Sequence, residues 1–159
     1  MKFVGREWEL GCFNDHYGEP SAFAIYGRRR IGKTRLMEHF CEGKRSIYIN
    51  CLMSGFSENL VHFADIISDF TGKPKGPYRS FRDVLADLYE IAKESTTVII
   101  IDEYPNLLDG TEDIPTLIQG FIDTKLKTTT SMLFVSGSSI SVMKRQLAGD
   151  KPLFDRYII

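Results

Sequence analysis

Short hydrophobic runs alternate along this chain with longer stretches in which hydrophobic positions recur every three or four residues. The runs have the length of buried strands and cover residues 22–26, 46–51, 97–101 and 132–135, and a fifth run begins at residues 157–159. Helical spacing occupies residues 36–41, 57–70, 80–92, 115–126 and 140–147, and an N-terminal helix ends before Pro20. Alternating strands and helices predict an α/β fold with a mostly parallel sheet.

Residues that can bind a ligand fall at the ends of the first four predicted strands. A glycine-rich loop follows the first strand, Asn50 lies at the end of the second, and Asp102 and Glu103 follow the third. Ser136 follows the fourth. Because ligands of parallel sheets bind outside the carboxyl ends of the strands, these residues predict a single site.

The glycine-rich loop has the spacing G-x-x-x-x-G-K-[ST], from Gly27 to Thr34. Gly27 lets the chain turn off the strand, and Gly32 lets the backbone approach a phosphate without a Cβ in the way. Lys33 would reach the β- and γ-phosphates of a nucleotide, and the Thr34 hydroxyl would ligate Mg²⁺. This Walker A pattern therefore predicts a nucleotide-phosphate site. The alternative is an ordinary turn between strand and helix with a surface lysine.

The third predicted strand ends in two adjacent carboxylates, which together with its apolar run form a Walker B pattern. Asp102 at the end of the strand can hold Mg²⁺, usually through water. Glu103 can orient or deprotonate the water that attacks the γ-phosphate. The alternative interpretation is a strand that ends in two solvated acids.

Composition restricts the classes of partner. The 159 residues, 43% of them hydrophobic, suit a single domain with one substantial core, and the net charge of −1 does not favour a polyanion binder. The dense basic cluster coincides with the glycine-rich loop, so nucleotide phosphates are a sufficient partner for it. The three cysteines and three histidines lack metal-ligand spacing. Without a signal peptide or a spanning segment in the sequence, a reducing cytoplasm is the default expectation, with no membrane partner.

Five motifs in order resemble the archaeal-type ATPases, which are AAA+-like P-loop proteins related to the STAND signalling ATPases. The motifs are FVGREWEL (3–10), YGRRRIGKT (26–34), IIDEY (100–104), VSGSS (135–139) and PLFDR (152–156). The resemblance implies a P-loop NTPase three-layer sandwich with strand order 5-1-4-3-2 and ATP as ligand. It also implies a helical lid after this point, so residues 1–159 are expected to be a nucleotide-binding domain truncated before the lid.

The resemblance also implies roles for single residues. Val4, Gly5 and Arg6 would cover the adenine. Asn50 matches the residue that can hold the catalytic glutamate inactive, and Ser136 or Ser138 matches the sensor of the γ-phosphate. Arg156 matches an arginine finger donated to a neighbouring subunit, which implies a homo-oligomer. The residues expected to contact the nucleotide in the loop are Gly27, Arg28, Arg29, Arg30, Ile31, Gly32, Lys33, Thr34 and Arg35.

Three of these residues could instead have ordinary structural roles, and several functions stay open. Asn50 could be a turn cap, Ser136 a buried hydroxyl, and Arg156 part of a surface ion pair. Mg²⁺-dependent ATP hydrolysis is the first functional hypothesis, and a nucleotide-gated regulatory module that turns over little is the second. A small-molecule kinase is less favoured, and a GTPase is disfavoured because the sequence has no Asn-Lys-x-Asp. DNA or protein partners of a longer protein follow from the family alone.

Overall fold

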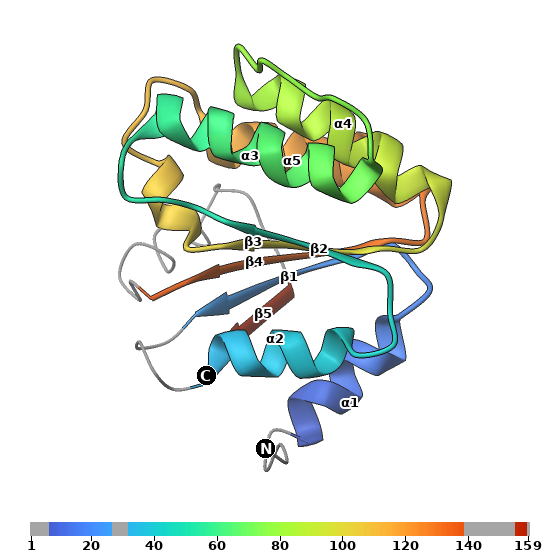
Figure 1. Ribbon diagram of the computed structural model, residues 1–159. Coiled ribbons are helices and arrows are strands. Elements are labelled where there is room, and N and C mark those ends of the chain that lie inside the picture. Colours follow the sequence, from blue (N-terminus) through green and yellow to red (C-terminus); the bar gives the residue numbers. More distant parts are fainter. Residues whose placement is uncertain (1–6, 27–31, 139–154, 159) are drawn as a thin grey trace.

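A computed structural model describes residues 7–26, 32–138 and 155–158 of the chain (Figure 1). For residues 26 and 155–158 it describes the backbone only. The helix predicted at residues 140–147 lies outside the described residues.

The centre of the fold is a five-stranded sheet in which every described pair of neighbours is parallel. Its order is β2-β3-β4-β1-β5, which is the expected order 5-1-4-3-2 counted from the other edge. The strands are β1 Ser21–Tyr26, β2 Ser46–Asn50, β3 Val98–Asp102, β4 Met132–Gly137 and β5 Asp155–Ile158. The predicted α/β class and its sandwich architecture are therefore confirmed.

Helices cover both faces of the sheet (Figure 1). Helices α1 (Glu7–His16) and α2 (Lys33–Cys41) lie on one face. On the opposite face lie α3 (Phe56–Thr71), α4 (Phe81–Glu94) and α5 (Ile114–Thr124), and the short 3₁₀ helices are η1 (Tyr104–Leu107) and η2 (Leu126–Thr128). Of the described helices, none combines the length and the apolar character needed to cross a bilayer.

Two hydrophobic cores, one on each face, explain why β3 is an unbroken apolar run. Ile99 and Ile101 pack into the core under α3, α4 and α5. Val98 and Ile100 point the other way and join the core beside α1 and α2. Successive side chains of a strand point to opposite faces, so a strand covered on both sides must be apolar throughout. The same alternation places Asp102 on the face of α2.

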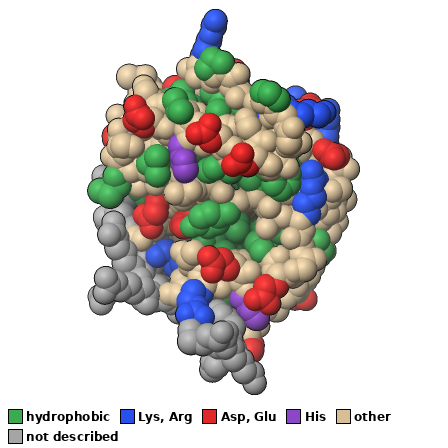
Figure 2. All heavy atoms as spheres, in the orientation of Figure 1, with side chains coloured by type: hydrophobic (Ala, Val, Ile, Leu, Met, Phe, Trp, Pro, Cys, Tyr) green, Lys and Arg blue, Asp and Glu red, His purple; other side chains and the backbone are tan. Residues whose placement is uncertain are grey.

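Local sequence signals fix several helix ends. The Ser80 side chain accepts a hydrogen bond from the Asp83 N–H at the start of α4, as the predicted capping pair requires. Asp113 caps α5 in the same way, with Pro115 in the first turn. Acidic and basic side chains are interspersed on the face drawn in Figure 2, in keeping with the near-neutral net charge.

Candidate functional site

The N-terminus of α2 has the geometry that an anion-binding site needs. Gly32 precedes the helix with φ 92° and ψ 17°, a left-handed conformation that glycine adopts without steric cost. No side chain caps this helix end, and its first turn has no acidic residue. The N–H groups of the first turn therefore face the site with the positive end of the helix dipole.

Lys33, Ser138 and Glu103 form a hydrogen-bonded chain across three elements. The Lys33 ammonium donates to the Ser138 hydroxyl at 3.4 Å, and that hydroxyl donates to Glu103 Oε1 at 2.6 Å. Lys33 is only 6% exposed although it carries a charge. The lysine of the Walker A pattern and the glutamate of the Walker B pattern thus meet at the residue that follows β4.

Asp102 is the second centre of the site, because hydroxyl groups from three elements reach its two carboxylate oxygens. The Ser136 hydroxyl donates to Oδ1 at 2.5 Å, and the Thr34 hydroxyl donates to Oδ2 at 3.5 Å. Tyr48 also donates to Oδ2 through its phenol hydroxyl. Ser136 and Asp102 are both buried, which strengthens these hydrogen bonds.

Glu103 has an unusual backbone conformation. Its φ is 55°, in the left-handed region, which non-glycine residues adopt at a cost of about 1–2 kcal/mol. Its N–H donates to Asp102 Oδ1 at 2.9 Å, and η1 begins at the next residue. Strain of this kind is often found where a side chain must be aimed at a reacting group.

The two serines at the end of β4, Ser136 and Ser138, differ in burial and in their contacts. Ser136 is fully buried inside β4, in register with Ile25, and contacts Asp102. Ser138 follows the strand and contacts both Lys33 and Glu103. Of the two sensor candidates, Ser138 therefore has the contacts with the Walker A lysine and the Walker B glutamate.

Asn50 lies opposite Asp102 in the register of β2 and β3. Its amide oxygen lies 3.0 Å from His62 Nε2, on α3. The residues after it are held by other contacts: the buried Asn59 bonds both polar groups of the Leu52 backbone, and Asn106 donates to the Cys51 carbonyl. The switch role of Asn50 stays a prediction, and the structure adds His62 as its partner.

Several predicted site residues fall outside the described part of the chain. They are Val4, Gly5, Arg6, Gly27, Arg28, Arg29, Arg30 and Ile31. Arg35 lies on α2 and is exposed. Arg156 was expected in a loop before the fifth strand, but its backbone lies within β5, paired with Ala24. The strand begins earlier than predicted, at Asp155, because the parallel pairing with β1 already starts at Phe23.

Tyr48 was not among the predicted site residues, although its hydroxyl contacts Asp102. The signal was available in β2, where Ser46, Tyr48 and Asn50 alternate with Ile47 and Ile49. The two isoleucines face one core, so Tyr48 between them projects on the opposite face, which is the face of Asp102. Burial first, and then the hydrogen bond and charge of Asp102, raise the pKa of Tyr48, so its hydroxyl keeps the proton that it donates.

The donor set suits a hard divalent cation. Thr34 Oγ1 and Asp102 Oδ2 lie 3.5 Å apart, and oxygen is the ligand that Mg²⁺ prefers. In the described part of the chain no cluster of three or more His, Cys, Asp and Glu side chains occurs that could hold a metal. A cation here would therefore depend on further oxygens, such as those of a phosphate. Nearby, burial raises the pKa of the Cys51 thiol, which keeps it protonated and inert.

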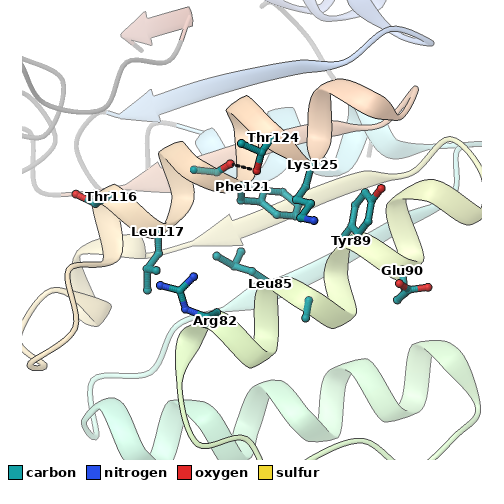
Figure 3. Close-up of a pocket in the computed structure, with 11 residues that line it drawn as sticks. Arg82, Leu85, Tyr89, Glu90, Thr116, Leu117, Phe121, Thr124 and Lys125 are labelled. Carbon is teal, nitrogen blue, oxygen red and sulfur yellow. Dashed lines mark hydrogen bonds between the residues drawn. The ribbon is translucent and has the colours of Figure 1, made fainter.

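A separate groove of about 600 Å³ lies between α4 and α5 (Figure 3). Leu85, Leu117 and Phe121 contribute apolar surface, with Arg82 and Lys125 among the charged residues that line it. None of the residues that meet at Lys33 and Asp102 lines this groove. It is therefore not part of the candidate site.

Comparisons with known proteins agree with this arrangement. A profile of the ATPase domain that occurs predominantly in Archaea matches residues 3–158. An uncharacterised protein of Methanocaldococcus jannaschii is 34% identical over 160 residues, which are 97% of this chain and 34% of that protein.

Solved structures of other proteins share the fold. A Walker-type ATPase of Pyrococcus abyssi superposes with a TM-score of 0.72 at 18% identity, over 99% of this chain and 53% of the other. The ORC2 protein of Aeropyrum pernix, solved as ADPNP and ADP complexes, has a TM-score of 0.62 at 14% identity, over 99% and 48%. This chain thus spans about a third of the curated relative and about half of each solved chain.

Proposed function

Because the chain belongs to the family of ATPase domains found predominantly in Archaea, we propose that it binds ATP with Mg²⁺ and hydrolyses it to ADP and phosphate. The observation that carries this proposal is the hydrogen-bonded chain from Lys33 through Ser138 to Glu103. It joins a phosphate-binding cation to a carboxylate beside a second centre, Thr34 and Asp102, with the oxygens that Mg²⁺ prefers.

Each residue then has a distinct role. Lys33 and the first N–H groups of α2 stabilise the charge of the phosphates. Thr34 and Asp102 would hold a magnesium ion, which when bound would supply Lewis-acid stabilisation of the phosphoryl oxygens. Glu103 orients the attacking water and accepts its proton as the new P–O bond forms and the bond to the ADP oxygen breaks. Ser138 would report the presence of the γ-phosphate, a role that its contacts with Lys33 and Glu103 support.

One observation favours a nucleotide-gated module as the second candidate function. The Glu103 carboxylate accepts a short hydrogen bond, 2.6 Å, from the Ser138 hydroxyl. A base engaged in this way must give up or share that contact before it can accept a proton from water. A domain in which this rearrangement is slow would hold ATP for long periods, and its bound state would matter more than its turnover.

Phosphate release separates the two candidates. With Mg²⁺, we expect the chain to release phosphate from ATP at a steady rate and to lose this activity in EDTA, because the metal neutralises charge in the transition state. GTP is the matched control, since the sequence lacks a guanine-reading motif. Tight ATP binding without steady release would favour the gated module, and the absence of any nucleotide binding would contradict both.

Arg156 carries the proposed link to a second copy of the chain. In the described sheet β5 is an edge strand beside β1, the strand that leads into the phosphate loop. Mixing Arg156→Ala with Glu103→Gln is expected to restore part of the turnover that each variant lacks alone, because one composite site is then intact. Phosphate release by the mixture is the measurement. If the mixture releases phosphate only at the sum of the rates of the two variants, Arg156 has no role in a neighbouring site.

The wider partners belong to a longer protein, since this chain spans about a third of its curated relative. DNA or protein partners and a coupled conformational change are proposals for that whole protein. The domain described above supplies the nucleotide site to which such partners would be coupled.

A further inference from the structure

The two oxygens of Asp102 carry four hydrogen-bond donors in this structure. Oδ1 accepts from the Ser136 hydroxyl and the Glu103 N–H, at 2.5 and 2.9 Å. Oδ2 accepts from the Thr34 hydroxyl at 3.5 Å and from the Tyr48 hydroxyl. An ionised carboxylate has about four lone-pair positions, so these four donors satisfy it completely.

Tyr48 reaches Asp102 diagonally across two strands. In the register of β2 and β3 its partner is Ile100, and Asp102 lies two residues further along β3. Diagonal neighbours of this kind are within reach of an aromatic side chain. Because both residues project on the face of α2, the phenol ends beside Thr34, on the same carboxylate oxygen.

Asp102 and Tyr48 differ in how far they are exposed to solvent. Asp102 is 6% exposed, whereas Tyr48 is 37% exposed and belongs to β2, an edge strand of the sheet. The Tyr48 hydroxyl can therefore leave Asp102 without opening a cavity in either core. The other donors to Asp102 come from the backbone, from the buried Ser136, and from Thr34 in the first turn of α2.

Thr34 and Asp102 Oδ2 also mark the position where Mg²⁺ would be held. A cation, or a water molecule in its hydration shell, needs the same feature of the carboxylate as the Tyr48 hydroxyl does, namely a lone pair of electrons. Thr34 does not exclude the ion, because its oxygen can ligate the metal while its proton still bonds Asp102. The Tyr48 proton occupies a lone pair of Oδ2, and a neutral phenol oxygen, unlike the hydroxyl of Thr34, is not a usual Mg²⁺ ligand, so this contact opposes the metal.

Resting on the magnesium-dependent function proposed above, we propose that the Tyr48 hydroxyl competes with Mg²⁺ for Asp102 Oδ2. Tyr48 is then a positioning residue that keeps the buried carboxylate satisfied when no metal is bound and lowers the affinity of the site for the ion. Binding of the metal releases the Tyr48 hydroxyl at the exposed edge of the sheet.

Tyr48→Phe tests this competition, because it removes the hydroxyl and keeps the ring. The affinity of a fluorescent ADP analogue is measured over a series of Mg²⁺ concentrations, which gives the concentration that half-saturates the metal-dependent gain. We expect this concentration to fall about three- to tenfold in Tyr48→Phe, the range that corresponds to one net hydrogen bond. The affinity measured in EDTA should stay unchanged.

Tyr78→Phe is the matched control. Its hydroxyl also donates to an aspartate, Asp87 Oδ2, at 2.7 Å, and it too is only partly buried. Both variants are expected to lower the melting temperature of the metal-free protein, but Tyr78→Phe should leave the Mg²⁺ dependence as it is. A purely structural role of Tyr48 would make the two variants alike.

A second measurement keeps the hydroxyl at position 48 and follows its surroundings by ¹⁹F NMR. With 3-fluorotyrosine placed at position 48 by codon suppression, the ¹⁹F resonance of the ADP complex is expected to shift when Mg²⁺ is added. An unmoved resonance, or a half-saturating Mg²⁺ concentration in Tyr48→Phe equal to or above that of the parent, would overturn the competition. A parent chain that fails to bind the ADP analogue would instead refute the proposed function itself.

Discussion

Replacing Lys33 with alanine is expected to abolish most of the thermal stabilisation that Mg²⁺ and ATP give the domain. A ligand present at 100 times its Kd that binds only the folded state adds about 2.7 kcal/mol, or about 5–10 °C for a domain of this size. Lys33 is nearly buried at the start of α2, where its ammonium group donates to Ser138, so an exposed lysine elsewhere does not replace its charge there. The melting temperature with and without Mg²⁺ and ATP is the measurement.

Lys127→Ala is the control for this experiment. Lys127 is an exposed lysine in η2, so its loss changes the net charge equally without touching the site. The control should keep the full shift. If Lys33→Ala keeps it as well, the assignment of Lys33 to the phosphates is wrong.

Glu103→Gln should lower ATP turnover by about 10²–10⁴-fold, the usual contribution of a positioned acid–base group. Glutamine can still accept the hydrogen bond from Ser138 and has no larger cost in the left-handed backbone region, so the fold and nucleotide affinity should persist. The measurement combines phosphate release with nucleotide affinity. Only the proton-accepting ability of the side chain is lost.

Two further variants serve as comparisons for Glu103→Gln. Glu90→Gln removes an exposed carboxylate on α4 that pairs with Lys93, and it should leave turnover unchanged. Asp102→Asn should instead weaken the Mg²⁺-dependent part of nucleotide binding, because it removes charge at the metal position. Turnover at the parent rate in Glu103→Gln would place the general base elsewhere.

Much of the fold could be predicted because its signals are local. The unbroken β-branched run of β3 can be satisfied only by a strand covered on both faces, and Ser80 with Asp83 marks the start of α4. The ends of strands were less predictable. Ser136 looks like an exit from β4 because it is polar, but Asp102 satisfies its hydroxyl and lets the strand continue to Gly137.

The residues of the candidate site could be named from the sequence where they depend on spacing along the chain, and not where they depend on contacts between distant strands. The Walker patterns name Lys33, Thr34, Asp102 and Glu103 directly. Tyr48 reaches Asp102 across 54 residues of sequence; the alternation in β2 gives its face, but the strand register is needed to make it a diagonal neighbour of Asp102. Ser136 and Ser138 share a face by their spacing of two, so sequence alone could not tell which of them reaches Lys33.

At Glu103 the left-handed backbone lowers the stability of the fold, while the side chain is needed for the proposed reaction. Glycine would adopt φ 55° without the cost that glutamate bears, so a selection for heat resistance alone would favour glycine there. Such a change would also remove the carboxylate beside Ser138. Directed evolution of this domain for stability would therefore tend to produce a more durable protein that has lost its proposed base.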